Sequence, residues 1–128
     1  MKLTLDTHIF LWAVTDDRRL PDQVRAVIED PAVQVYVSAA CVWEIAIKVG
    51  LGRLDADPAV LVRAIGDSGF EELPVTAAHA AAVGRLEPIH RDPFDRMLLA
   101  QAVVEDLTVA TVDEAVRRYP GVRLLPAG

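Results

Sequence analysis

Four acidic residues stand where the sequence predicts strand ends or helix starts, and together they could hold a metal ion. Asp6 follows the first apolar run of the chain, and Asp113 follows a late one. Glu44 lies within a helical stretch, and Asp95 opens another. In an open parallel sheet, ligands bind outside the carboxyl ends of the strands, so these side chains could converge there. Carboxylates in close contact resist joint ionisation, so such a cluster usually holds a divalent cation.

Two of these carboxylates also have an ordinary structural explanation. Asp6 could cap a helix that begins at Thr7. Glu44 precedes Lys48 by four residues, the favourable order for a helical ion pair that contributes about 0.3–0.5 kcal/mol. Either role would place the same side chain at the same edge of the sheet.

The other two carboxylates sit in helix-start patterns. Asp92 and Pro93 predict a helix cap followed by a first helical residue, which puts Asp95 in the first turn. The segment from Thr111 to Glu114 fits a capping box, in which the threonine hydroxyl and the glutamate carboxylate each bond to the backbone of the other. The positive end of the helix that Asp95 opens would favour its ionised carboxylate.

The donor types narrow the choice of metal. Oxygen ligands without His or Cys suit Mg²⁺ or Mn²⁺ rather than zinc. The three histidines, His8, His79 and His90, are not spaced as a metal motif, and we predict structural roles for them. His8 is the strongest exception, because it lies two residues after Asp6.

The elements that must position these residues alternate between strand and helix along the chain. Such alternation predicts βαβ units and a parallel sheet with helices on both faces, that is, a single-domain α/β fold over residues 1–128. The expected strands are Lys2–Leu5, Gln34–Val37, Glu71–Val75, Leu107–Ala110 and Val122–Leu125. The expected helices are Thr7–Val14, Pro21–Glu29, Ala39–Val49, Pro58–Asp67, Thr76–Gly84, Pro93–Glu105 and a short one around Asp113–Arg118.

Composition excludes several classes of protein. The 128 residues suffice for one domain with its own core, and 52% hydrophobic with 25% charged residues is typical of a compact soluble protein. No apolar run approaches the roughly 20 residues of a membrane span, and the N-terminal pattern is not that of a secretory leader. The single cysteine, Cys41, excludes an internal disulfide and indicates a cytoplasmic protein, in which we expect it to be buried. The net charge of −6 argues against non-specific nucleic-acid binding by the whole surface.

Some polar residues could support the acidic set. Lys48 and Arg96 are its nearest basic neighbours in sequence, and either could screen ligand repulsion or hold a phosphate instead of forming a surface ion pair. Thr7, Ser38 and Thr111 offer hydroxyls that could orient a water or a carboxylate, or merely cap turns.

Two tryptophans lie on expected helices. Core packing is the default for Trp12 and for Trp43, because aromatic side chains bury large areas. The alternative is an interface, in which Trp12 with Phe10 and Leu11 forms an apolar patch that a partner helix could cover.

Several segments resemble PIN-domain ribonucleases, most of all the VapC toxins of bacterial type II toxin–antitoxin pairs. These segments cover almost the whole chain in order: Leu5–His8, Ser38, Trp43–Lys48, Leu51–Leu54, Asp92–Arg96, Leu99–Ala102 and Thr111–Asp113. The resemblance implies an α/β/α sandwich with a central parallel sheet, dependence on Mg²⁺ or Mn²⁺, and endonucleolytic cleavage of RNA. It also implies a homodimer and neutralisation by a cognate antitoxin.

The resemblance assigns roles to individual acids. It implies that Asp6, Glu44 and Asp95 are the core metal ligands and catalytic residues, with Asp113 as a more variable fourth. Asp92 would cap the helix or support a ligand. The family also implies 5′-phosphate and 3′-hydroxyl products, so a metal-activated water would be the nucleophile.

Three other functions were weighed against a nuclease. A receiver domain would need an acidic pair after the first strand and a late lysine, and an aspartyl phosphatase would need Asp-x-Asp where this chain has Asp6-Thr7-His8. A catalytically weak RNA- or protein-binding module on the same fold stays open, because an intact acidic set does not prove turnover. Metal-dependent RNA cleavage, with Asp6→Asn as the control, would separate the enzyme from the binder.

Overall fold

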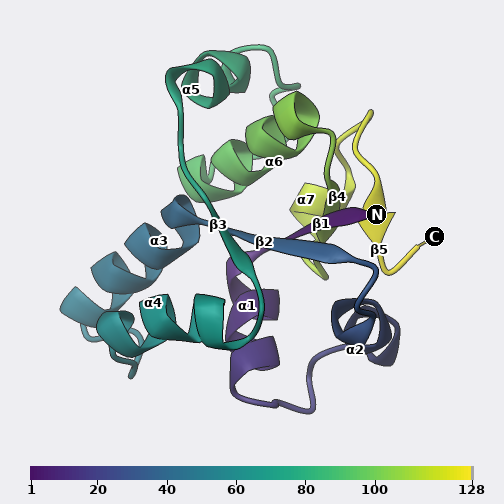
Figure 1. Ribbon diagram of the computed structural model, residues 1–128. Coiled ribbons are helices and arrows are strands. Elements are labelled where there is room, and N and C mark those ends of the chain that lie inside the picture. Colours follow the sequence, from purple (N-terminus) through teal and green to yellow (C-terminus); the bar gives the residue numbers. More distant parts are fainter. Residues whose placement is uncertain (128) are drawn as a thin grey trace.

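The computed structural model describes residues 1–127 and forms one five-stranded sheet with helices on both faces (Figure 1). The strands are β1 (Lys2–Leu5), β2 (Gln34–Ser38), β3 (Glu71–Leu73), β4 (Thr108–Ala110) and β5 (Leu124–Leu125). The helices are α1 (Thr7–Val14), α2 (Asp22–Glu29), α3 (Ala39–Gly50), α4 (Pro58–Asp67), α5 (Ala77–Val83), α6 (Pro93–Glu105) and α7 (Glu114–Arg117). This confirms the predicted single-domain α/β fold with a central parallel sheet.

The strand order places the ends of β1 and β4 side by side. The order is β3-β2-β1-β4-β5, and every neighbouring pair is parallel. From β1 the chain builds the sheet to one side through β2 and β3, then returns to build the other side through β4 and β5. In such sheets, ligands bind in the crevice beyond the carboxyl ends of the strands at the point where the strand order reverses, which here lies between β1 and β4. Asp6 and Asp113 follow those two strands.

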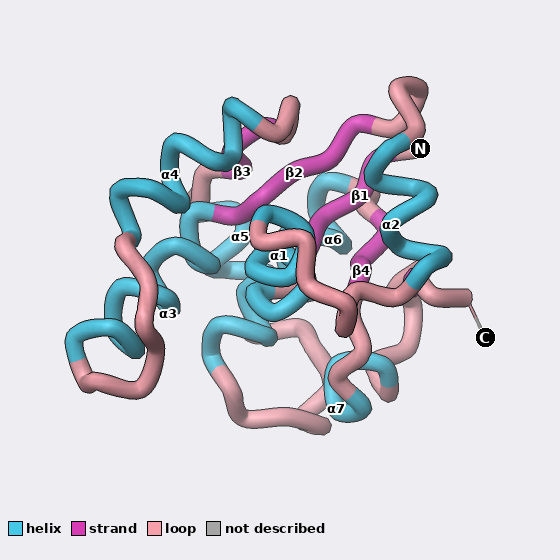
Figure 2. Tube along the Cα trace, turned by 90° about the horizontal axis from the view of Figure 1, so that it is seen from below, coloured by secondary structure: helices cyan, strands magenta, loops and turns pink. Residues whose placement is uncertain are grey.

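The core lies in two clusters on opposite faces of the sheet. Helices α1 to α4 pack their apolar residues against one face, around Phe10, Ile45 and Ile65, and Figure 2 looks onto the face covered by α1, α2 and α4. Helices α6 and α7 cover the other face, around Leu99 and Val116. The central strands are buried on both faces, which explains their nearly continuous apolar sequence.

Most expected boundaries agree with the structure, and the differences have local causes. Strand β3 ends at Leu73 instead of Val75, because Pro74 has no amide hydrogen to continue the ladder. Helix α2 begins at Asp22, so Pro21 is its N-cap and not its first helical residue. None of the helices in residues 1–127 has the length and hydropathy that a membrane crossing requires.

The expectations for the large aromatic residues need correction. Trp43 is 64% exposed, because the face of α3 that packs on the core carries Cys41 and Ile45 instead. Trp12 is partly buried against the core, as expected. The proposed surface patch with Phe10 was wrong, since Phe10 is fully buried.

Two isoleucines of α3 test which face of that helix holds the core. Ile45 is fully buried and Ile47 is 39% exposed. We expect Ile45→Ala to lower the free energy of unfolding by about 2–5 kcal/mol, because it leaves a cavity in the core. Ile47→Ala should cost under about 1 kcal/mol. Urea denaturation followed by circular dichroism measures both, and equal losses would contradict this packing.

Candidate active site

Asp6 is held rigidly at the end of β1. Its backbone amide donates to the Ala110 carbonyl oxygen of β4 at 3.0 Å, and its Oδ1 accepts from the Ile9 amide at 2.8 Å as the N-cap of α1. Its Oδ2 accepts from the Thr111 hydroxyl at 2.5 Å. The side chain is only 4% exposed. The predicted capping role is therefore confirmed, and it fixes the carboxylate at the crevice between β1 and β4.

Thr111 connects Asp6 with Asp113. Its hydroxyl donates to Asp6 and accepts from the Asp113 amide at 3.0 Å. The predicted capping box from Thr111 to Glu114 was wrong, because Asp113 is the N-cap of α7 and accepts from the amides of Ala115 and Val116. The threonine hydroxyl is committed to the Asp6 carboxylate, a contact across the sheet that local sequence does not reveal.

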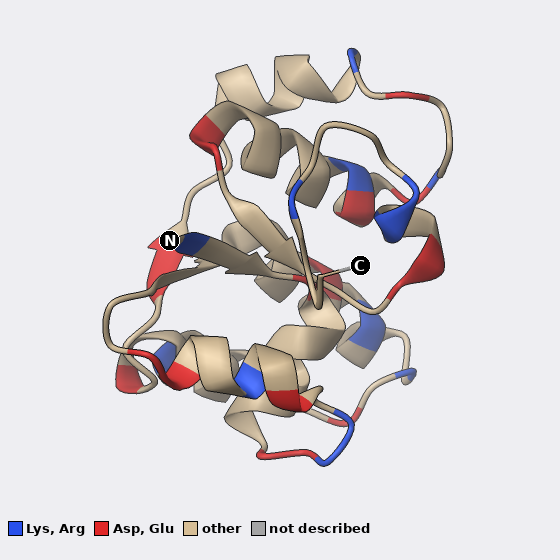
Figure 3. Cartoon of the chain, turned by 90° about the vertical axis from the view of Figure 1, so that its right-hand side faces the viewer, with Lys and Arg blue, Asp and Glu red and all other residues tan. Residues whose placement is uncertain are grey.

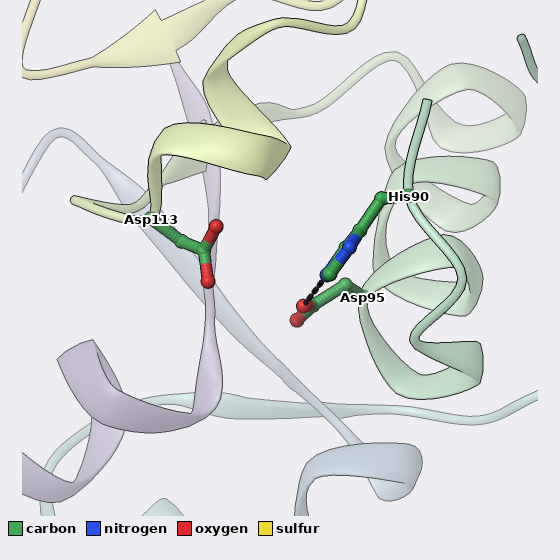
Figure 4. A group of neighbouring side chains, drawn as sticks. All are labelled: His90, Asp95 and Asp113. Carbon is green, nitrogen blue, oxygen red and sulfur yellow. Dashed lines mark hydrogen bonds and ion pairs between the residues drawn. The ribbon is translucent and has the colours of Figure 1, made fainter. Parts of the chain in front are cut away.

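Three side chains of types that can bind a metal come together in front of these strands. His90, Asp95 and Asp113 each offer a ligand atom, and these atoms lie within 4.8 Å of one another (Figure 4). The His90 Nε2 atom lies 2.8 Å from Asp95 Oδ2. Asp113 faces this pair from the start of α7. The structure thus brings two of the four predicted carboxylates into one group. Among residues 1–127, Asp6 and Glu44 lie outside that group.

Glu44 is tied to the residue next to Asp6. Its Oε1 accepts from the Thr7 hydroxyl and its Oε2 pairs with Lys48 Nζ, both at 2.6 Å. The predicted ion pair with Lys48 is therefore confirmed. Glu44 is 6% exposed, so Thr7 and Lys48 orient a carboxylate that is almost wholly removed from water. Of the three candidate hydroxyls, Ser38 is the one that caps a helix, accepting from the Ala40 amide.

Burial and mutual repulsion oppose ionisation of two of these acids. Burial raises the pKa of Asp6, and the charge of Asp113 adds to the effect against the hydrogen bonds from Thr111 and Ile9. Burial raises the pKa of Asp95 to about 6, with further contributions from Asp92 and Asp113. A divalent cation would relieve both effects, and carboxylate oxygens with an imidazole are donors that Mg²⁺ and Mn²⁺ accept.

His90 lies beside the acidic group, a proximity that sequence reasoning did not anticipate. Its ring faces Asp95, and its expected structural role stays a prediction. The only sequence signal was its place five residues before Asp95, in the irregular segment that leads into α6. Of the other two histidines, His79 forms a capping box with Thr76, which is the structural role expected of it. His8 is exposed beside Trp12.

Arg96 holds the segment that carries His90. Its Nη1 donates to the carbonyl oxygens of Glu87 and His90 and to the Tyr119 hydroxyl, and its Nη2 donates to the Val83 carbonyl. These bonds therefore give Arg96 a role in organising the loop, and no surface ion pair of Arg96 is found among residues 1–127. Its contact with a phosphate stays a prediction.

Two further expectations are confirmed. Asp92 is the N-cap of α6, and its Oδ1 accepts from the amides of Phe94 and Asp95 at 2.9 and 3.1 Å. Cys41 is buried, and burial raises the pKa of its thiol to about 12, so it behaves as a small apolar side chain.

Comparisons with known proteins agree with this architecture. The family model of the PIN domain matches residues 3–122. Three solved structures share the fold. VapBC2 from Rickettsia felis, bound to a DNA fragment from their promoter, has a TM-score of 0.68 and 17% identity over 97% of each chain. FitAcB from Neisseria gonorrhoeae has a TM-score of 0.63 and 24% identity over 95% of each chain. The PIN domain endonuclease Utp24 has a TM-score of 0.55 and 18% identity over 96% of this chain and 82% of its own. No curated protein matches the chain.

The pKa of Asp95 predicts a pH-dependent stability of the metal-free protein. Its folded-state pKa of about 6 lies above the ordinary aspartate value of 3.8, so the stability that the protonated carboxyl group contributes is present at pH 4 and lost as the pH rises through 6. Asp95→Asn removes this titration. In the presence of a chelator, it should raise the free energy of unfolding by about 1–2 kcal/mol at pH 8, allowing for partial exposure, and change it little at pH 4.

Urea denaturation at the two pH values provides the measurement. Asp67→Asn, at the exposed end of α4, controls for the loss of one negative charge. A gain for Asp95→Asn that is equal at both pH values would contradict the assigned pKa.

Proposed function

This chain belongs to the PIN-domain family, and on that premise we propose that it is a metal-dependent endoribonuclease and the toxin of a type II toxin–antitoxin pair. The observation that carries the proposal is the meeting of Asp95, Asp113 and His90 at the carboxyl end of the sheet, with Asp6 joined to them through Thr111. PIN nucleases usually use divalent metals, and Mg²⁺ or Mn²⁺ suits these donors.

In this proposal, some residues bind the metal ion and others orient the side chains that bind it. The proposed metal ligands and catalytic residues are Asp6, Glu44, Asp95 and Asp113. A bound cation supplies Lewis acidity, which lowers the pKa of a water and offsets negative charge on a phosphodiester. Thr7 and Thr111 fix the carboxylates of Glu44 and Asp6, and each oxygen keeps a second lone pair for a further contact. Lys48 balances one charge of the set.

The proposals that the substrate is RNA and that the protein is a toxin rest on its likeness to proteins of known structure. The neighbours include a VapBC complex and FitAcB, and each spans nearly the same length as this chain. Utp24 is an endonuclease on the same fold. We infer by analogy that a cognate antitoxin covers the acidic site in the bacterial cytoplasm, with basic side chains directed at the carboxylates. Acidic and basic positions are interspersed along the helices in the view of Figure 3.

An apolar groove supports the proposal of a homodimer. It encloses about 690 Å³ between α3, α5 and the start of α6, and its lining includes Trp43, Val83, Phe94 and Met97. The ring of Trp43 meets Phe94 edge-on with centroids 5.2 Å apart. A tryptophan that is 64% exposed beside such a groove is typical of an interface anchor. A second copy of this chain is the proposed occupant.

Cleavage in the presence of metal tests the proposed activity. Wild-type protein with Mg²⁺ or Mn²⁺ should cut single-stranded RNA and leave 5′-phosphate ends. Asp6→Asn and Asp95→Asn should lower the rate by at least about 100-fold, because each removes a charged ligand. Asp67→Asn should match wild type.

The same proteins give a second measurement that does not depend on finding the right RNA. Mn²⁺ should raise the melting temperature of wild type and of Asp67→Asn, since a ligand of the folded state stabilises it. Asp6→Asn should blunt the rise. Stabilisation by the metal without RNA cleavage would favour the binding module, and equal shifts in all proteins would place the cation elsewhere.

Light scattering during size-exclusion chromatography tests the homodimer. Wild type should have twice the 13.9 kDa mass of the chain. Trp43→Ser should shift it to the monomer, because truncation of a buried anchor typically costs at least about 2 kcal/mol of binding free energy. Val60→Ser is the control, since Val60 is 48% exposed on α4, across the sheet from α5 and α6. A dimer that survives Trp43→Ser would exclude this groove as the interface.

A further inference from the structure

His90 stands among the carboxylates as a nitrogen donor. Its Nε2 lies 2.8 Å from Asp95 Oδ2, and its ligand atom is within 4.8 Å of those of both Asp95 and Asp113. Two ligands on opposite sides of a Mg²⁺ or Mn²⁺ ion are about 4.2–4.4 Å apart, given metal–ligand distances of about 2.1–2.2 Å. The three side chains therefore need to move only slightly to share one ion.

The backbone of His90 is fixed from both sides. Its amide donates to the Tyr119 hydroxyl at 2.9 Å, and its carbonyl oxygen accepts from Tyr119 at 3.2 Å and from Arg96 at 3.3 Å. Tyr119 is only 4% exposed, so this anchor belongs to the core. The imidazole is itself 26% exposed. The backbone that carries the imidazole is thus held in place, and the ring contacts Asp95.

An imidazole changes which cation the site prefers. Mg²⁺ favours oxygen ligands and gives up its waters reluctantly, whereas Mn²⁺, a softer transition-metal ion, binds an imidazole nitrogen more tightly than Mg²⁺ does. Of the two ions that suit this family, a nitrogen ligand increases the affinity of the site for Mn²⁺ and changes its affinity for Mg²⁺ little.

We propose that His90 is a direct metal ligand, through Nε2, and makes the site selective for Mn²⁺ over Mg²⁺. The inference rests on the proposed metal-dependent function and adds a fifth ligand to the four carboxylates. Binding requires the neutral imidazole with its proton on Nδ1, so that the Nε2 lone pair turns from Asp95 to the ion. The competing role is a hydrogen bond that only orients Asp95.

Pulsed electron spin resonance on bound Mn²⁺ distinguishes the two roles, because a directly bound nitrogen gives a ¹⁴N modulation of the spin echo. The wild-type complex should show this modulation, and protein grown with ¹⁵N-histidine should lose it. His90→Gln should lose it as well. His8→Gln is the matched control, since His8 is exposed and two residues from Asp6, and it should keep the modulation.

Calorimetric titration with each chloride salt measures the selectivity. His90→Gln should weaken Mn²⁺ binding by about tenfold or more and Mg²⁺ binding by less than about threefold. His8→Gln should change neither. Circular dichroism checks that each variant is folded, and the isotope experiment on wild type tests the ligand without any variant.

The outcomes separate this inference from the function on which it rests. A protein that binds no Mn²⁺ would overturn the metal-dependent function itself. Bound Mn²⁺ without ¹⁴N modulation would overturn the ligand role of His90 alone, as would a modulation that persists in His90→Gln. Equal weakening of both cations in His90→Gln would overturn the selectivity.

Discussion

The burial of carboxylates close to one another is the constraint on which the candidate site depends. Asp6 and Asp95 are withdrawn from water, and each also feels the charge of Asp113, so both have raised pKa values. A fold that merely needed stability would separate such groups or replace them with apolar side chains. Here the strand reversal at β1 and β4 brings them to one crevice. That concentration of charge is the physical basis for the proposed cation site.

Each of these acids also stands at the start of a helix, which offsets part of the free-energy cost of burying its charge. Asp6 and Asp113 are the N-caps of α1 and α7, and Asp95 lies in the first turn of α6. The amide hydrogens and the helix dipole stabilise the negative charge of each. A capping role and a ligand role are therefore not alternatives in this chain. The same geometry that satisfies the helix start aims the carboxylate at the crevice.

Hydrogen bonds between distant segments complete the site. Thr111 spans from β4 to β1, and Thr7 joins α1 to Glu44 on α3. Arg96 and Tyr119 bind the loop before α6, which brings His90 to Asp95. These contacts explain why side chains that look like ordinary surface or turn residues are placed with little freedom. The groove beside Trp43 adjoins the same loop, because it is also lined by Arg91 and Arg96.

The sequence by itself determined the order of the elements and the acids at their ends. Strand and helix periods are local, and so are the proline and aspartate signals that started α4 and α6 where they were expected. Tertiary structure decided which side chains meet. Contacts such as Thr111 with Asp6 join residues 105 positions apart, and no local pattern encodes their distance. For the same reason the sequence suggested a buried Trp43, and it did not reveal that Arg96 binds the loop before α6 or that His90 lies beside Asp95. The exposure of a side chain and the partners it finds depend on how the helices pack onto the sheet.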